Sequence, residues 1–383
     1  MVQFERLALC AVMIFAAVPA LAQQAPTPFK PEQLSVKGAI DPGPNLLIHQ
    51  QEWKGAGSTA VFSKDDLSFK GLMTAGNMAQ MLVGVDGKTA YTQSTFMKRI
   101  TYGDLEHVLQ IFDIATLSPV KEVILPPKAA MSLGYAALLQ QSADGKFVYV
   151  QNGTPASSVT VVDVTKAAVT QEIPTPGCWG IYPSSKGYKF TSLCGTGTVT
   201  TFNLTPAGTL ADSAQSAKVF DPDKDPLYIT SATAGDDRLF PSYNGSILRI
   251  SDADKAAKLV ESVKINEGIE GNWAPGGYAP MGYSEKTGVV FVGMHADAKN
   301  GSHKNAAEEI WAYDLKAKKL LSRTPVEHIM TITVTNDDVP VVFGLTEDPK
   351  VIRFTADPKA GFALNKTGEA KLTGYPYVAA VTP

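Results

Sequence analysis

Residues 108–124 read VLQIFDIATLSPVKEVI, and this stretch decides the fold of the 383-residue chain. Apolar and polar residues alternate up to Asp113, a turn follows over residues 113–116, and the alternation then resumes. A period of two places one side of an extended strand against a core. Two such strands joined by a short turn form an antiparallel pair, so the stretch predicts a β-hairpin.

Related hairpins recur along the chain, and their number predicts the architecture. Seven copies begin near Thr59, Val108, Val159, Val199, Ile247, Ile310 and Val351. A turn and a short strand precede several copies, as in DGKTAY at residues 86–91 and DGKFVY at residues 144–149. Repeats about 40 to 60 residues apart, with about four strands each, are typical of β-propellers. We therefore expect an all-β, seven-bladed β-propeller over residues 44–383, with a large β-sandwich or a β-helix as the alternative.

The composition limits the classes of function. Hydrophobic residues make up 44% of the chain and charged residues 19%, which is typical of a folded globular protein. The formal net charge is -3, so the chain lacks the basic surface that attracts nucleic acid or anionic lipid. We therefore expect neither nucleic acid nor a lipid surface as a partner.

The first 43 residues differ in composition from the rest. Residues 7–18 are an apolar run too short to span a bilayer with ease, and residues 20–22 (ALA) form a small-x-small cleavage motif. We predict a signal peptide over residues 1–22 and export of the mature chain, with an uncleaved membrane anchor as the alternative. Residues 23–43 are rich in Pro, Gln and Ala and are predicted to form a flexible N-terminal arm.

Cysteine usage agrees with export. Cys10 leaves with the predicted signal peptide, so only Cys178 and Cys194 remain. Two cysteines near strand ends in an oxidising compartment favour one disulfide, here between adjacent strands of one blade. A catalytic or metal-binding thiol pair is the alternative, although the chain has no CxxC motif and no His beside either cysteine.

The chain shows no self-contained catalytic constellation. His295, His303 and Asp297 share one stretch, but a zinc site needs closer and more regular spacing. We expect these residues to form hydrogen bonds within their loop or to contact a partner. The G-x-S-x-G motif of hydrolases is missing from the sequence, and acids such as Asp113 and Asp163 recur at hairpin turns, where they are predicted to be structural. We therefore expect no catalytic residue and no metal ligand here, which favours a partner-binding subunit.

Inserts and tryptophans indicate where a partner binds. The inserts lie at residues 96–107, 129–140, 266–283 and 294–307, and blade inserts usually gather on the binding face. Trp53, Trp179 and Trp273 lie in or beside loops and are candidate interface anchors, with core packing as the alternative. Trp311 occupies the hairpin position that Phe112 has in the second copy and is predicted to be core.

Several stretches together resemble a known family. They are RITYGD at 99–104, LPPKAAMSLGYAALLQQSADGKFVYVQN at 125–152, GCWGIYP at 177–183, SLCGTG at 192–197, NWAPGGY at 272–278 and MHADAKNGSHKNAAEEIWAYD at 294–314. The chain resembles the heavy subunit of the quinoprotein amine dehydrogenases, most closely aromatic amine dehydrogenase and more distantly the methylamine dehydrogenase heavy chain. The resemblance covers most of the mature chain and is thin in the first and last blades.

The resemblance implies a periplasmic complex of two propeller subunits and two small subunits. In the family, the small subunit carries tryptophan tryptophylquinone and the catalytic base, primary amines are oxidised to aldehyde and ammonia, and electrons pass to a cupredoxin such as azurin or amicyanin. This chain then serves as scaffold and as lining of the substrate channel. The alternatives are a stand-alone exported propeller that binds a partner or surface polymer, and a propeller hydrolase of the lactonase type.

The resemblance also implies roles for individual residues. Trp53 is the aromatic nearest to the position where the family lines the mouth of the substrate channel, and the pair Cys178 and Cys194 resembles a disulfide of the family. Five residues in matched or inserted loops are expected at the interface with the small subunit: Arg99, Tyr135, Trp179, Trp273 and Tyr278.

Overall fold

The computed structural model describes residues 31–32, 35–52, 55–100 and 102–382, and the chain divides into two units, residues 1–37 and 38–383. The predicted signal peptide, residues 23–30 and 33–34 of the predicted arm, and Trp53 lie outside the described residues. Where the structure describes the chain, its regular elements are β-strands and three short 3-10 helices, with no α-helix. The all-β prediction is therefore confirmed. None of the described helices is long and apolar enough to cross a membrane.

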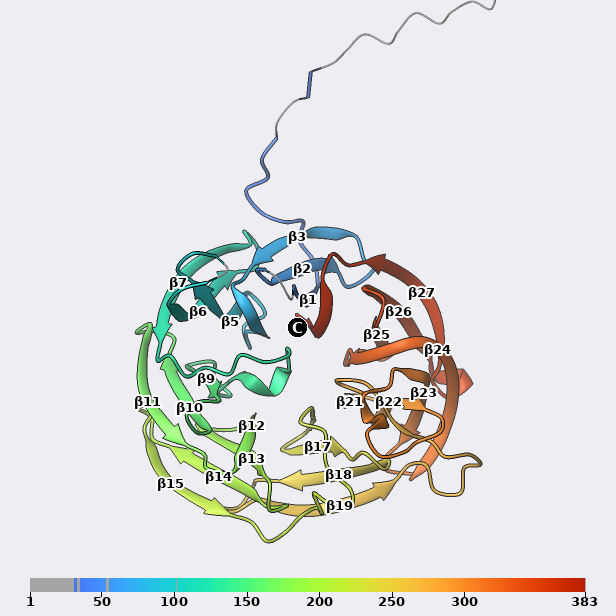
Figure 1. The fold of residues 1–383 in the computed structure, drawn as a ribbon. Helices are drawn as coiled ribbons and strands as arrows, with labels where there is room; N and C mark the ends of the chain where they lie inside the picture. Colours follow the sequence, from blue (N-terminus) through green and yellow to red (C-terminus); the bar gives the residue numbers. More distant parts are fainter. Residues whose placement is uncertain (1–30, 33–34, 53–54, 101, 383) are drawn as a thin grey trace, which may run out of the picture. The chain divides into compact units, whose positions relative to one another are not determined.

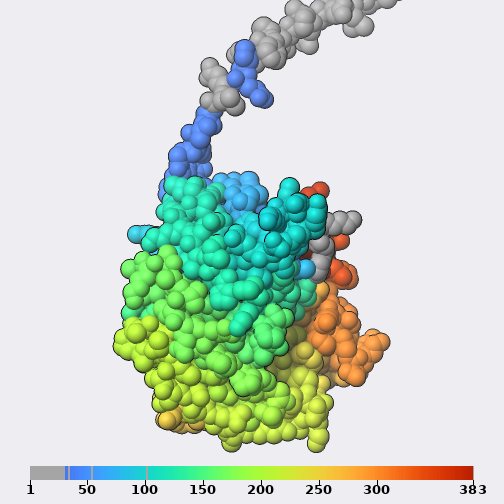
Figure 2. Space-filling view, turned by 60° about the vertical axis from the view of Figure 1, so that its left-hand side comes forward, coloured from blue at the N-terminus to red at the C-terminus, as the bar shows by residue number. Residues whose placement is uncertain are grey.

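Five sheets of unit 38–383 have four antiparallel strands each and stand around a common centre (Figure 1). From the centre outward, the first sheet has β28 (Tyr375–Val381), β1 (Asn45–Gln51), β2 (Ser58–Ser63) and β3 (Phe69–Thr74), and the second has β4 (Asn77–Val83), β5 (Thr89–Met97), β6 (Leu105–Asp113) and β7 (Ser118–Leu125). The third sheet has β8 (Leu139–Gln141), β9 (Phe147–Asn152), β10 (Ser158–Asp163) and β11 (Ala168–Pro174), and the fourth has β12 (Cys178–Pro183), β13 (Lys189–Cys194), β14 (Val199–Leu204) and β15 (Leu210–Gln215). The fifth sheet has β16 (Ala232–Ala234), β17 (Asp237–Pro241), β18 (Ser246–Ser251) and β19 (Lys258–Lys264). The sheets follow one another in chain order, and the colours of the face in Figure 2 run accordingly from blue through green to yellow. This radial arrangement is a β-propeller.

The sixth sheet has eight strands, and here the structure corrects the prediction of seven separate blades. It consists of β20 (Ala274–Pro275) and β21 (Met281–Ser284), which both pair with β22 (Val289–His295), and then β23 (Ala307–Asp314), β24 (Lys319–Val334), β25 (Val341–Thr346), β26 (Lys350–Asp357) and β27 (Ala363–Lys371). The first half of the 16-residue strand β24 pairs with β23 and its second half with β25. The ladder shifts register between the halves, where Glu309 pairs with Pro325 and Ala307 with Ile329, but β24 remains one continuous strand, so the structure has five separate blades.

All seven predicted hairpins form. They are β2–β3, β6–β7, β10–β11, β14–β15, β18–β19, β23–β24 and β26–β27. In β6–β7, Val108 lies opposite Ile124, as the alternation predicts. The backbone N–H and the hydroxyl of Thr116 donate to Asp113 Oδ1 at 2.7 and 3.0 Å, so the predicted turn role of this carboxylate is confirmed.

The first and last strands of the propeller close the ring. β28 pairs with β1 from Leu46 opposite Val381 to Gln51 opposite Tyr375, so one sheet contains both ends of the folded unit. Figure 1 shows the red strand beside the blue ones near the centre. This pairing covers the inner edge of β1 and makes β28 the innermost strand of the blade.

Apolar clusters fill the spaces between neighbouring sheets. Trp311 on β23 is fully buried in one of these clusters, together with Val290 and Val292 of the adjacent strand β22. Its indole N–H donates to Glu309 Oε2 at 2.6 Å, so burial leaves no unpaired donor. The prediction that Trp311 is a core residue is confirmed.

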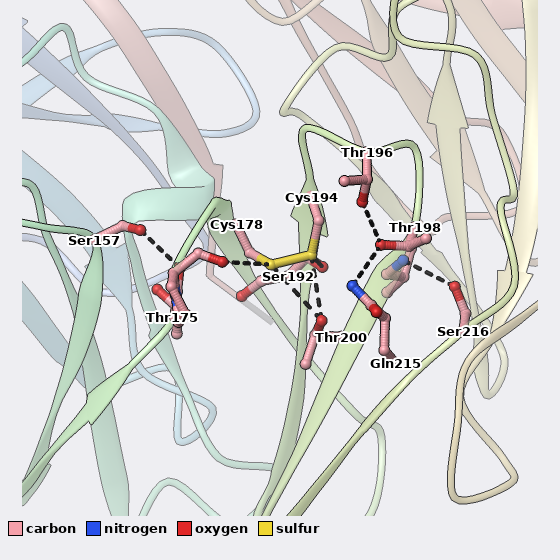
Figure 3. The surroundings of a disulfide bond; sticks show 12 residues. Ser157, Thr175, Cys178, Ser192, Cys194, Thr196, Thr198, Thr200, Gln215 and Ser216 are labelled. Atoms are coloured by element: carbon pink, nitrogen blue, oxygen red, sulfur yellow. Dashed lines mark hydrogen bonds between the residues drawn. A yellow bond between two sulfur atoms is a disulfide. The ribbon is translucent and has the colours of Figure 1, made fainter.

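One disulfide joins the two inner strands of the fourth blade (Figure 3). Cys178 on β12 lies directly opposite Cys194 on β13, and their sulfur atoms are bonded. The Thr200 hydroxyl on β14 lies 3.3 Å from Cys194 Sγ and donates to it, because a disulfide sulfur has no proton. The prediction of one disulfide between adjacent strands is confirmed.

Removal of this disulfide should destabilise the protein. The bond closes a loop with a sequence separation of 16, for which loop closure in the unfolded chain contributes about 3 kcal/mol. We expect the double variant Cys178→Ser/Cys194→Ser to lose about that free energy of unfolding, measured by urea titration. Dithiothreitol should lower the stability of the wild type and leave the variant unchanged; an equal effect on both would contradict the prediction.

The buried His49 should make stability depend on pH. His49 on β1 is fully buried, Thr59 Oγ1 is its hydrogen-bond partner at 3.2 Å, and burial lowers the pKa of the ring to about 4. Between pH 6.5 and 4 the unfolded chain holds a proton that the folded chain lacks, so stability present above pH 6.5 is lost as the pH falls toward 4, by about 3 kcal/mol in all. His49→Gln should reduce this slope in urea titrations by the share of His49, whereas replacing the exposed His328 by Gln should keep it. An unchanged slope in His49→Gln would contradict the prediction.

Candidate functional site

The long loops of the propeller lie at one end of the sheets. Because neighbouring strands are antiparallel, the links between sheets and the loops between second and third strands share one end, and the seven hairpin turns share the other. We call the first end the loop face. All four predicted inserts contribute to it, through the links 126–138 and 265–273 and the loops 98–104 and 296–306.

A tyrosine cluster occupies the centre of the loop face. Its rings come from two sheet-to-sheet links, from the turn between β17 and β18, from the segment between β20 and β21, and from β28: Tyr135, Tyr228, Tyr243, Tyr278, Tyr375 and Tyr377. Ring centroids lie 4.7 Å apart for Tyr228 and Tyr243, 5.3 Å for Tyr278 and Tyr377, and 5.2 Å for Tyr375 and Tyr377. The imidazole of His303 stacks on Tyr243 at 4.1 Å. A cavity of about 130 Å³ is lined by Tyr135, Tyr228, Tyr243, Tyr278 and His303 among others.

Backbone contacts fix the positions of these rings. The N–H of Tyr278 donates to Met330 O on β24 at 2.7 Å, and the N–H of Gly277 donates to His303 O at 3.0 Å. Gly277 has φ of 118°, and an added Cβ would lie 2.3 Å from Met330 O, so this approach requires glycine. The hydroxyl of Tyr228 reaches both Pro275 O and His303 O at 2.8 Å, which joins three loops.

The cluster is uncharged near neutral pH. Burial raises the pKa of Tyr135 to about 12, and it also raises the pKa values of Tyr228, Tyr375 and Tyr377. Burial, with smaller contributions from Lys304 and His295, lowers the pKa of His303. These four phenols therefore keep their protons and the His303 imidazole stays neutral. Such a site offers aromatic faces and neutral donors rather than a base or a nucleophile.

The central channel continues below the cluster. A cavity of about 220 Å³ is lined by residues of the innermost strands β16, β21, β24 and β28, with Tyr135 and Tyr377 among them. The 3-10 helix η1 (Ala136–Leu138), which follows Tyr135, lies near the centre of Figure 1. The cluster therefore forms the mouth of the channel on the loop face.

A second and larger hollow adjoins the cluster. Its volume is about 730 Å³, and Tyr243 and His303 line both this hollow and the small cavity. Trp273 also lines it; the ring lies 5.7 Å from that of Trp311, and the Arg323 guanidinium lies 4.7 Å from the Trp273 ring. Trp273 therefore packs against the core on one side and lines the hollow on the other. Its position agrees with core packing and also with the predicted role as an interface anchor.

The predicted interface residues do not all meet. Tyr135 and Tyr278 come together in the tyrosine cluster, and Trp273 lines the adjoining hollow. Trp179 is half-buried at the start of β12, and Arg99 is exposed in the loop 98–104, with its guanidinium 5.6 Å from the Tyr102 ring. All five lie on the loop face; their contact with a small subunit stays a prediction. The prediction for Trp53 falls on a residue that the structure does not describe.

The histidines of the loop 296–306 and its flank form loop contacts. His295 Nε2 lies 2.9 Å from Ser302 Oγ in the 3-10 helix η2 (Ser302–Lys304), which confirms the predicted hydrogen bond within this region. Among the described residues, no three His, Cys, Asp or Glu side chains gather closely enough to hold a metal ion.

Sequence reasoning missed four members of the cluster. Tyr228, Tyr243, Tyr375 and Tyr377 lie in the stretches DPLYIT, PSYNGS and GYPYV. Each stretch falls at a sheet-to-sheet link, at a turn between second and third strands, or at the start of an innermost strand. An alignment of the repeats would have shown that these four tyrosines occupy positions at the same end of the sheets.

Known proteins similar to this chain share one description. The family model of the methylamine dehydrogenase heavy chain (MADH) matches residues 55–379. A methylamine dehydrogenase heavy chain from Methylophilus methylotrophus is 23% identical over 322 residues, which is 82% of this chain and 78% of the relative. Another, from Methylobacillus flagellatus, is 25% identical over 304 residues, which is 78% of this chain and 75% of the relative.

Solved structures support the fold. A protein proposed to be a 6-phosphogluconolactonase, from Bacteroides fragilis, aligns with a TM-score of 0.61 at 14% identity and covers 92% of this chain and 100% of that one. Dihydro-heme d1 dehydrogenase aligns with a TM-score of 0.56 at 12% identity and covers 92% of this chain and 77% of that one. At such identities the likeness concerns the fold alone. The family model matches residues 55–379 and confirms the predicted family: this chain belongs to the methylamine dehydrogenase heavy chain family.

Proposed function

We propose that this chain is the heavy subunit of a periplasmic amine dehydrogenase that oxidises primary amines to aldehyde and ammonia. The observation that carries the proposal is the family match over residues 55–379, joined to a channel mouth on the loop face. Two heavy and two small subunits would form the complex, and a cupredoxin of the azurin or amicyanin type would accept the electrons. The stretches that resemble aromatic amine dehydrogenase favour that branch of the family. Export would follow cleavage of the predicted signal peptide at residues 1–22.

The proposed small subunit supplies the redox chemistry, since tryptophan tryptophylquinone takes up the electrons of the amine. The cluster in this chain fits the task of guiding an amine to that group. Aromatic faces attract an ammonium ion, and the phenol hydroxyls of Tyr135 and Tyr228 stay protonated because burial raises their pKa values. Lys304 also lines the cavity at the mouth, and its ammonium group repels a cation, so the mouth holds an amine weakly enough to release it into the channel.

We also propose that the eight-stranded sheet corresponds to two of the seven expected blades. The two halves of β24 pair with different neighbours, so the first half completes one four-stranded unit and the second half begins the next. Counted in this way, the seven hairpins mark seven units.

A lactonase-type propeller is the second candidate, because solved structures with this fold include a protein proposed to be a 6-phosphogluconolactonase. A metal-dependent hydrolase needs acids or histidines that converge on its channel. Among the described residues that line the 220 Å³ channel cavity there is no Asp, Glu or His. This lining favours the dehydrogenase subunit.

An activity assay separates the two candidates. The chain is co-expressed with the small-subunit gene beside its own, and the purified complex is given benzylamine, tyramine and methylamine with an artificial electron acceptor. We expect reduction of the acceptor and release of ammonia in proportion. Hydrolysis of lactones by the chain alone, with no amine-dependent reduction, would support the second candidate.

Trp53 is proposed to set the amine preference. One ring at a channel mouth changes discrimination between similar substrates by about tenfold to a hundredfold in kcat/KM. Trp53→Ala should therefore change the ratio of kcat/KM for tyramine and methylamine by at least about tenfold, with assembly intact, and Trp53→Phe should change it less. An unchanged ratio in Trp53→Ala would contradict this role.

A further inference from the structure

The hollow of about 730 Å³ on the loop face carries an unusual balance of charge. Three lysines line it, Lys224, Lys264 and Lys299, against one acid, Asp223, which leaves two net positive charges. The chain as a whole has a net charge of -3, so this region, the lysine recess, is opposite in sign to the rest of the chain. Such a local excess attracts anions to this place on the surface.

Two of these lysines are available to a ligand. The ammonium group of Lys264 donates to Asn244 O at 2.7 Å and is held in place. Within the described residues, the side chains of Lys224 and Lys299 are exposed and form no hydrogen bond or ion pair. Two ammonium groups around one hollow can therefore bind two carboxylates without breaking an existing hydrogen bond or ion pair.

The walls of the lysine recess are rigid and suited to a polypeptide. Tyr243 and His303 stack at 4.1 Å on one side, and Trp273 is held between the recess and the core by Trp311 and Arg323. Aromatic walls with lysines form the kind of pocket that binds an anchor residue of another protein. A hollow of about 730 Å³ is far larger than an inorganic anion and has the size of several side chains.

The position of the recess indicates which partner it receives. Tyr243 and His303 line both the recess and the cavity at the channel mouth, so anything seated in the recess lies beside the mouth. A subunit that works at the mouth must cover this part of the loop face. The chain segment of that subunit nearest to the recess then meets two unpaired positive charges.

We propose that the lysine recess binds an acidic segment of the small subunit, a short stretch of polypeptide with at least two carboxylates, and so fixes the small subunit over the channel mouth. This inference rests on the proposed function and adds a docking site to it. Lys224 and Lys299 pair with the carboxylates, and the aromatic walls hold the adjoining side chains. Docking through these charges weakens as salt screens them.

Charge reversal tests the docking site. The full-length chain with Lys224→Glu/Lys299→Glu is co-expressed with the small subunit, and association is measured by analytical ultracentrifugation at low and high ionic strength. The matched control is Lys88→Glu/Lys316→Glu, which makes the same change of net charge at exposed turns on the opposite end of the sheets. We expect association about 100-fold weaker for the recess variant, with little salt dependence, and wild-type association for the control.

The association and phosphate measurements distinguish docking of the small subunit from binding of a free anion. Equal association of the recess variant and the control would overturn it. Titration of inorganic phosphate into the full-length chain tests whether the recess binds a free anion instead. If phosphate binds the wild type but not the recess variant, and the variant associates with the small subunit as the wild type does, the recess binds a free anion and the docking proposal is wrong. A wild-type complex that assembles without quinone absorbance would refute the proposed function, and the association data would still decide the docking site.

Discussion

Deletion of β28 is expected to abolish folding of the propeller. A chain that stops at residue 374 lacks the strand that pairs with β1 and closes the ring. It also lacks Tyr377 and Val378, which are buried in the core, and the carbonyl groups that accept the hydroxyl protons of Thr331 and Thr333. Each large apolar side chain contributes about 1.5 to 3 kcal/mol, so the loss approaches the whole stability of an ordinary domain.

The measurement is soluble yield together with cooperative unfolding in urea. The deletion variant should appear in the insoluble fraction or unfold without a cooperative transition, because the exposed edge of β1 favours aggregation. A chain that stops at residue 382 serves as the control and should unfold like the wild type. Cooperative unfolding of the deletion variant at the wild-type midpoint would show that closure through β28 does not hold the ring together.

Trp311→Ala should cause the largest loss of stability by a single substitution in this group of predictions. Trp311 is fully buried, and removal of such an indole leaves a cavity that costs about 3 to 5 kcal/mol. It also leaves the Glu309 carboxylate without the indole donor at 2.6 Å and removes the ring against which Trp273 packs. The free energy of unfolding from urea titration measures the cost. Trp179→Ala, which truncates a half-buried ring, is the matched control and should cost less; equal losses would contradict the core role of Trp311.

The hairpins were predictable because their signals are local. The alternation around Asp113 and the turn itself fall within one stretch, and both the strands and the carboxylate contacts agree with the structure. The disulfide was predictable because Cys178 and Cys194 lie at the ends of two strands that are neighbours in sequence. The buried position of Trp311 follows from its place in the repeat.

The blade boundary at β24 was not predictable from the residues. Pro325 is a residue that usually ends a strand, yet here it stays opposite Glu309 in the ladder and the strand continues to Val334. The outcome depends on pairing with strands on both sides, which residues 319–334 do not encode by themselves. The tyrosine cluster was missed for a related reason. Its rings come from segments far apart in the chain, and only closure of the ring brings Tyr135 beside Tyr278 and Tyr377.

Purification of the native complex tests the central claim most directly. The chain is isolated by an affinity tag from cells that express it with its neighbouring genes, and the product is analysed for subunit composition and for visible absorbance. We expect a small, cysteine-rich subunit in equal number with this chain and a quinone absorbance that bleaches when a primary amine is added. A colourless preparation that contains this chain alone and shows no spectral change with amine would contradict the proposed function.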